Sequence, residues 1–265
     1  MLLEILKKRN PVHTIKLLSY LLICSFILVG CSEDDNVTLD TLQANNKKPL
    51  GTSANDLLSE INFTSLSIEI VSVQGFEPTT TAIDRFKQFL QERLFKPDGI
   101  TITQRTIPSS NKTPFTIEEI IEIENNNRTV FNQTDAVTVF IYFADGSKEQ
   151  DTEEKITLGS AYLNTSIVIY ESTIRKLSSR PNAPLLSTIE TATLNHEFSH
   201  LLGLVDIGSP KQTNHVDTDS QGHCNIASCL MSAAIEFGNG AMGLGDDIPK
   251  LDVQCIADLR ANGGK

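Results

Sequence analysis

Hydrophobic and polar residues repeat with period two in several short stretches of the chain, which predicts the strands of one sheet. Apolar and polar residues alternate over residues 66–73, as in a half-buried strand, and isoleucines recur over residues 100–107. A nearly continuous β-branched and aromatic run over residues 136–143 is typical of a strand buried on both faces. Residues 157–164 and 166–170 predict two further short strands.

Apolar residues at helical spacing predict helices between and after these strands. Threonines at 79–81 offer N-caps to a helix with apolar positions up to residue 94. Thr116, with Glu119 three residues later, has the capping-box pattern and predicts a second helix. A long helix is predicted to end at Gly203, and residues 248–259 predict a last helix that starts near a proline. This order of elements predicts the α/β (α+β) class with a mixed sheet.

The first thirty residues have the pattern of an export signal and are not expected to belong to the fold. Basic residues at positions 7, 8, 9 and 16 precede an apolar stretch at 17–29 that is short for a membrane span. It ends in Leu-Val-Gly-Cys, which resembles a bacterial lipobox, where cleavage precedes an acylated cysteine, here Cys31. Residues 32–35 are acidic and resemble the export signal of Bacteroidetes lipoproteins. We therefore expect a signal peptide at 1–30 and a lipid-anchored protein of the outer membrane, exposed at the cell surface.

Composition and charge limit the partners of the exported chain. The formal net charge is -11, with 33 acidic and 22 basic residues and no basic cluster, which argues against binding to nucleic acid. Residues 31–62 are polar without a sustained period and predict a flexible tether. Residues 63–265 suffice for one sizeable domain, with an upper part at 63–203 and a lower part at 204–265, and we expect a monomer.

The chemistry of the chain is concentrated in residues 195–205, which read NHEFSHLLGLV. On a helix, His196 and His200 lie on one face and can bind the same metal ion, with Glu197 beside them. Gly203 can end this helix in a conformation closed to other residues. A catalytic zinc site has three protein ligands and an open position, so a third ligand is expected after Gly203.

Two stretches resemble zinc proteases of the metzincin clan and offer different third ligands. The first, HEFSHLLGLVD from His196, resembles the pattern HExxHxxGxxH or, as in snapalysin, HExxHxxGxxD, which implies that Asp206 is the ligand. The second, HCNIASCLM from His223, resembles the run in archaemetzincins whose histidine is the third ligand and whose methionine, here Met231, forms the turn under the metal. His215 is a candidate by residue type alone. Ligand preference and the spacing to Met231 favour His223, and the other two remain alternatives.

The remaining cysteines bear on a second metal ion. In archaemetzincins a later Cys-x-x-Cys pair completes a second zinc site, but only Cys255 is present in that region of this chain. We therefore expect one zinc ion, with a disulfide or free thiols among the cysteines. Cys224 and Cys229 are the local candidates for a disulfide, and either of them with Cys255 is an alternative.

The resemblance implies a metzincin-like fold, with a mixed twisted sheet, a backing helix, an active-site helix and a small C-terminal subdomain ending in a helix. It also implies a zinc-dependent endopeptidase in which Glu197 is the general base and residues 158–163 pair with an extended peptide substrate. One alternative is a catalytically inactive metzincin-fold lipoprotein that serves in binding or adhesion, and another is a non-peptidase metal hydrolase. Glu197 favours an enzyme, because a pure binder has no use for a carboxylate beside the metal.

Overall fold

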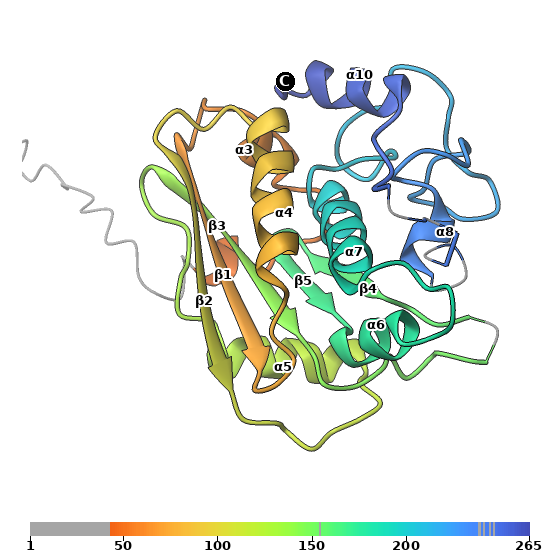
Figure 1. Ribbon diagram of the computed structural model, residues 1–265. Coiled ribbons are helices and arrows are strands. Elements are labelled where there is room, and N and C mark those ends of the chain that lie inside the picture. The colour runs from red at the N-terminus through yellow and green to blue at the C-terminus, as the bar shows by residue number, and fades with distance from the viewer. Residues whose placement is uncertain (1–42, 154, 238–239, 241, 244, 246) are drawn as a thin grey trace, which may run out of the picture. The chain divides into compact units, whose positions relative to one another are not determined.

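The stretches with strand periodicity form one five-stranded sheet in the order β2-β1-β3-β5-β4 (Figure 1). The computed structural model describes residues 43–265 except 154, 238–239, 241, 244 and 246. The strand bounds are β1 Ser65–Val73, β2 Gly99–Ile107, β3 Ala136–Phe143, β4 Gly159–Leu163 and β5 Ser166–Ile169. β2, β1, β3 and β5 are parallel, and β4 is antiparallel to β5 at the edge of the sheet. The predicted mixed α/β sheet is therefore confirmed.

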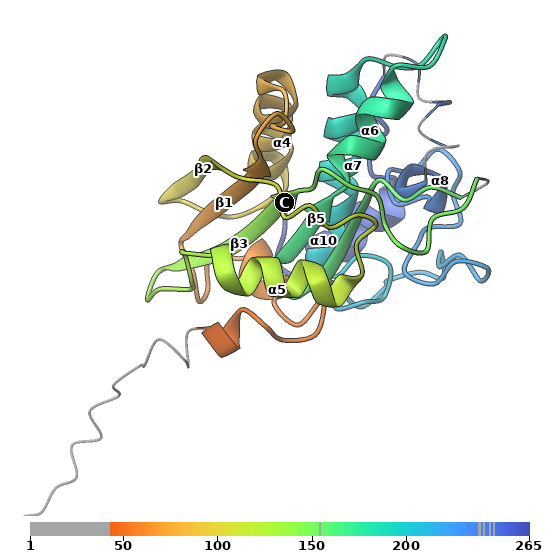
Figure 2. The ribbon, with the colours of Figure 1, turned by 90° about the horizontal axis from the view of Figure 1, so that it is seen from below.

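Helices cover both faces of this sheet, with α5 on one face and α4 and α7 on the other (Figure 2). The helix bounds are α3 Ala54–Leu58, α4 Thr80–Arg93, α5 Ile117–Asn127, α6 Glu171–Ser178, α7 Leu186–Leu201, α8 Ala233–Glu236 and α10 Val253–Ala261. Alternate residues of β3 point into the two resulting cores: Ile141 and Phe143 into one, Phe140 and Tyr142 into the other. β3 is thus buried on both faces, as its apolar run predicted.

The helix caps show which local signals decide where the helices begin. The hydroxyl of Thr79 accepts a hydrogen bond from Ala82 N, and Thr116 forms the predicted capping box with Glu119. The last helix begins later than predicted. Its N-cap is Asp252, whose carboxylate accepts from Cys255 N at 2.8 Å, so the start near Pro249 was wrong.

The described part of the predicted tether belongs to the folded domain. Leu57 and Leu58 in α3 are fully buried in the core. Asn46 is also buried, and its side-chain amide donates to Asn132 Oδ1 at 2.8 Å and to Thr165 Oγ1 at 3.1 Å. The polar composition was misleading because these polar side chains bond to the sheet. The prediction of a flexible segment is therefore wrong for residues 43–62, whereas the predicted signal peptide at 1–30 and Cys31 lie outside the described residues.

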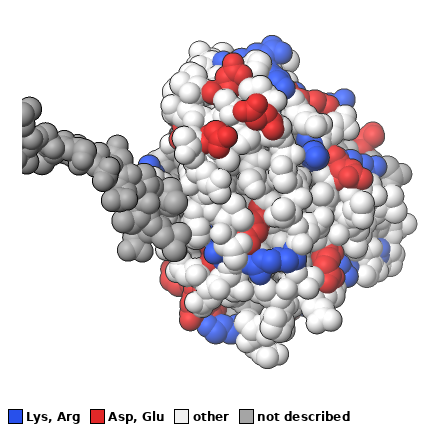
Figure 3. Space-filling view, turned by 90° about the vertical axis from the view of Figure 1, so that its left-hand side faces the viewer, with Lys and Arg blue, Asp and Glu red and all other residues white. Residues whose placement is uncertain are grey.

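The surface and the helix lengths bear on contacts with large charged or apolar partners. Acidic and basic side chains are interspersed on the face shown in Figure 3. That face offers no extended basic area of the kind that binds a phosphate backbone. Among the described residues, every helix is too short or too polar to cross a membrane.

Candidate metal centre

The helix α7 brings two histidines together at the distance that one metal ion requires. His196 and His200 are four residues apart on this helix, and their Nε2 atoms are 3.2 Å apart. Two nitrogens bound to one tetrahedral zinc ion at about 2.0–2.1 Å lie about 3.4 Å apart. The observed separation therefore fits a shared ion.

His223 approaches the same point from the long segment that follows α7. One ligand nitrogen from each of His196, His200 and His223 forms a group in which all atoms lie within 4.8 Å of one another. The ring of His223 has its centroid 5.3 Å from that of His196 and 5.2 Å from that of His200. Its Nδ1 contacts Ser220 Oγ at 3.1 Å, which leaves Nε2 directed at the other two rings. These three histidines form the candidate metal centre.

The structure places the other two candidate third ligands elsewhere. Asp206 pairs with Lys211 at the surface, with 2.5 Å between Oδ2 and Nζ. His215 is buried against Asp258, with Nε2 3.3 Å from Oδ2. Neither residue is part of the three-histidine group.

Gly203 explains why the chain does not present Asp206 to the metal centre. Its φ is +75°, and a Cβ atom there would lie only 2.3 Å from Ser209 N. Its carbonyl oxygen accepts hydrogen bonds from the amides of Ile207, Gly208 and Ser209, so the chain folds tightly back at this point. Asp206 lies in this tight loop and faces Lys211, and the third histidine follows only after the loop.

Burial keeps the two helical histidines neutral, which suits a metal ligand. Removal from solvent lowers the pKa of His196 to about 4, and nearby His223 lowers it further. The pKa of His200 also lies well below its ordinary value because of burial and the neighbouring imidazoles. At neutral pH both rings therefore keep the lone pair that a metal ion needs.

Glu197 is held between α7 and the edge strand β4. Its Oε2 accepts a hydrogen bond from Ala161 N at 2.8 Å, while Oε1 is buried and has no hydrogen-bond partner among the described residues. Gly159 makes this approach possible, because a Cβ atom there would lie 2.7 Å from Glu197 Cγ. No sequence signal had marked Gly159. Burial and the charge of Glu236 raise the pKa of Glu197 well above its ordinary value, and a bound cation would act in the opposite direction.

A cleft of about 360 Å³ opens onto these residues and brings in charged groups that the sequence analysis missed. Its polar lining includes Lys148, Ser160, Tyr162, Glu197, His200 and Glu236. The carboxylate of Glu236, in the short helix α8, lies 2.9 Å from Nε2 of His223. Burial alone would raise the pKa of Glu236, but the contact with His223 and the nearby His196 outweigh it and lower the pKa. Glu236 lies on a helix of only four residues, for which no periodic signal exists.

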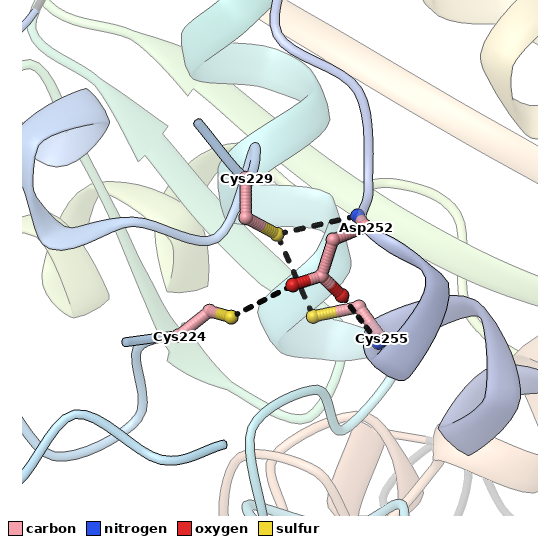
Figure 4. Close-up of side chains that lie close together, drawn as sticks. All are labelled: Cys224, Cys229, Asp252 and Cys255. Atoms are coloured by element: carbon pink, nitrogen blue, oxygen red, sulfur yellow. Dashed lines mark hydrogen bonds between the residues drawn. The ribbon is translucent and has the colours of Figure 1, made fainter. Parts of the chain in front are cut away.

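A second group of donor atoms lies at the start of α10, away from the cleft (Figure 4). Cys224 Sγ is 3.2 Å from Asp252 Oδ2, and the sulfurs of Cys229 and Cys255 are 3.6 Å apart. All three cysteines are free, so the predicted disulfide between Cys224 and Cys229 is not formed in this structure. Two thiolates on one tetrahedral zinc ion would be about 3.8 Å apart, so this group also fits a metal ion.

The thiols of this second group differ in how readily they ionise. A hydrogen bond from Cys255 lowers the pKa of Cys229 to about 7, whereas burial raises the pKa of Cys224 to about 12. The pKa of Cys255 is raised by the same contact with Cys229 and by burial. Only thiolates bind metal ions well, so an ion here would have to displace protons from at least two sulfurs.

Comparisons with known proteins give two distant structural likenesses. Archaemetzincin from Methanopyrus kandleri matches with a TM-score of 0.47 and 15% identity over 75% of this chain and 96% of that chain. Metalloproteinase-II from Bacteroides fragilis matches with a TM-score of 0.43 and 15% identity over 77% of this chain and 55% of that chain. No protein-family model matches the sequence, and no curated protein is significantly similar to it. The chemistry of the site therefore rests on this chain's own residues.

Proposed function

We propose that this chain is a zinc-dependent endopeptidase. The observation that carries the proposal is the convergence of three buried imidazoles beside a buried carboxylate. His196, His200 and His223 would hold the ion, and Glu197 Oε1 faces the same region without a protein partner. A set of three neutral nitrogen donors with a carboxylate beside it suits a hydrolytic zinc site better than a purely structural one.

The residues of the chain have distinct tasks in this proposal. A zinc ion, when bound, supplies a Lewis acid that polarises the scissile carbonyl and makes a bound water molecule more acidic. Glu197 Oε1 accepts a proton from the attacking water and delivers it to the nitrogen of the leaving amine. The amide of Ala161 holds Oε2, so that Oε1 remains directed at the water.

The peptide substrate would lie along β4, the edge strand beside the metal centre. An edge strand presents unpaired backbone groups to which an extended peptide can add as a further strand. Because the amide of Ala161 is already bonded to Glu197, the peptide would use other backbone groups of β4. The cleft lined by Lys148 and Tyr162 would then accept a substrate side chain.

The substitution Glu197→Gln tests this function. It should leave zinc bound and lower peptide hydrolysis by at least about 100-fold, because the amide cannot accept the proton. Zinc content is measured by mass spectrometry, and hydrolysis with panels of protein and ester substrates. Unchanged hydrolysis would overturn the mechanism. A zinc-loaded wild type without hydrolysis would favour the binding or adhesion alternative, and ester hydrolysis alone would favour the non-peptidase hydrolase.

We also propose that Cys224, Cys229, Asp252 and Cys255 hold a second, structural metal ion. Four protein donors leave no open position, which is the arrangement of structural zinc sites. Three sulfurs favour zinc over calcium or magnesium, which prefer oxygen ligands. The ion would join the start of α10 to the segment that also carries His223.

The proposed location of the enzyme is the outer surface of the cell, with a lipid on Cys31. The support is the sequence of residues 1–35, with its basic start, apolar run and lipobox-like end. Metabolic labelling with a fatty acid should mark the wild type and not Cys31→Ser. A labelled Cys31→Ser variant, or release of the wild type as a soluble protein, would contradict this location.

A further inference from the structure

The carboxylate of Glu236 lies beside the metal-facing nitrogen of the third histidine. Its Oε2 is 2.9 Å from His223 Nε2, which is the atom left to face the metal because Nδ1 contacts Ser220. The side chain of Glu236 is 16% exposed and lines the cleft together with Glu197 and His200. Glu236 therefore occupies the approach to the metal centre.

The position of Glu236 is fixed by backbone contacts with the chain that leads into β4. The carbonyl oxygen of Glu236 accepts a hydrogen bond from Leu158 N at 2.9 Å. The next residue, Phe237, forms a β-bridge with Thr157. These contacts hold α8 at the start of the edge strand, so the carboxylate is placed by the fold and not by its own flexibility.

An ion held by the three histidines would lie within reach of this carboxylate. Zinc binds imidazole nitrogen at about 2.0–2.1 Å and carboxylate oxygen at about 2.0–2.2 Å. An oxygen 2.9 Å from one ligand nitrogen needs only a small side-chain adjustment to share that nitrogen's ion. Both carboxylates of the cleft are close to the ion, but Glu197 is already held by Ala161 N, whereas Glu236 points at a ligand atom.

We propose that Glu236 is the fourth protein ligand of the metal ion in the resting enzyme. This proposal rests on the proposed zinc site and adds to it that the resting site is closed by three histidines and one glutamate. Substrate would then have to displace the carboxylate before hydrolysis. Lys148 lines the same cleft, with its Nζ 3.3 Å from Ser160 Oγ, and would receive the displaced negative charge.

The test compares the zinc affinity of Glu236→Gln with that of Glu197→Gln in the full-length chain. Both substitutions remove one negative charge from the same cleft, but only the first removes a proposed ligand. Affinity is measured by competition with a coloured chelator, and His200→Ala identifies which binding step belongs to the three histidines. We expect Glu236→Gln to weaken that step at least about 10-fold and Glu197→Gln to change it less than about 3-fold. Thermal unfolding followed by circular dichroism checks that each variant is folded.

The possible outcomes separate this proposal from the proposed function. Equal effects of the two glutamine variants would overturn the role of Glu236 as a ligand while leaving the three-histidine site intact. A wild-type chain in which His200→Ala removes no binding step would instead overturn the zinc site itself. As a second measurement, acetate should restore the visible spectrum of cobalt-loaded Glu236→Ala toward that of the wild type. No response to acetate, together with unchanged affinity, would exclude the proposal.

Discussion

Nδ1 of His196 lies 2.7 Å from the carbonyl oxygen of Leu230, a residue 34 positions later in the chain. A carbonyl oxygen only accepts hydrogen bonds, so Nδ1 carries the hydrogen and Nε2 keeps the lone pair that faces His200. The segment from His223 to Leu230 therefore does two things. It supplies the third histidine, and it orients the first one.

Met231 supports this segment from below, and its size should matter for the metal centre. The side chain is fully buried, and its backbone carbonyl accepts from Cys224 N at 2.7 Å. We expect Met231→Ala to lower the free energy of unfolding by about 2–5 kcal/mol and to weaken zinc binding, because Leu230 would shift. Met231→Leu, which conserves volume, should cost less than about 1.5 kcal/mol. Urea unfolding and chelator competition measure both quantities, and equal effects of the two variants would refute a packing role.

Asp252 has two separable functions, which a single substitution can distinguish. Oδ2 contacts Cys224 in the second metal group, whereas Oδ1 caps α10 by accepting from Cys255 N. Asparagine is as good an N-cap as aspartate but is a poor metal ligand, so Asp252→Asn should keep the helix and lose the ion. Metal content should fall from two ions per chain to one by mass spectrometry, and to none when His200→Ala is added. Two ions in Asp252→Asn would show that the carboxylate is not a ligand.

Local signals in the sequence identified α7 and its three polar residues, but not what surrounds them. The spacing of His196 and His200 fixes their relation within one helix, so no tertiary information is needed. The choice between Asp206 and His223 depends on how the chain turns after Gly203, and sequence spacing cannot specify that turn. Glu236 enters the cleft only because α8 pairs with the start of β4, a long-range contact without a local pattern.

The same distinction applies to the elements of the fold. β1 and β3 were predicted because their alternation or apolar run reflects burial directly. The sequence analysis missed α6, which begins after Tyr170 without a side-chain cap. It also missed α3, whose five residues are too few for a periodic signal. Short or uncapped helices of this kind are stabilised by packing, which a single sequence does not display.

A buried ion pair between α5 and the sheet should be essential for stability. Arg128 Nη1 lies 2.8 Å from Glu124 Oε1, and both side chains are 1% exposed. Arg128→Met would leave a buried carboxylate without its countercharge, and we expect a loss of about 3–5 kcal/mol in urea unfolding. Adding Glu124→Gln should recover part of this loss, because the amide carries no charge. A double variant no more stable than Arg128→Met would contradict this explanation.

A pair of buried glutamates should make stability fall as the pH rises. Glu171 in α6 is fully buried beside Glu190 in α7, and its Oε1 is 2.6 Å from Arg175 Nε. Burial and then the charge of Glu190 raise the pKa of Glu171 to about 9, from 4.5 in the unfolded chain. Because the folded state holds this proton more tightly, its stabilising effect is complete below pH 4.5 and is lost as the pH approaches about 9.

The substitution Glu171→Gln keeps the size of the side chain and removes this titration. For one proton the slope is at most about 1.4 kcal/mol per pH unit, so the wild type should lose stability relative to Glu171→Gln between pH 5 and 9. Urea unfolding at several pH values measures the difference. Lys96→Met serves as a control away from the pair, and its difference from the wild type should not follow the same slope below pH 7, because burial lowers the pKa of Lys96 only to about 8. A constant difference between wild type and Glu171→Gln across this range would show that Glu171 is already ionised in the folded protein at pH 5.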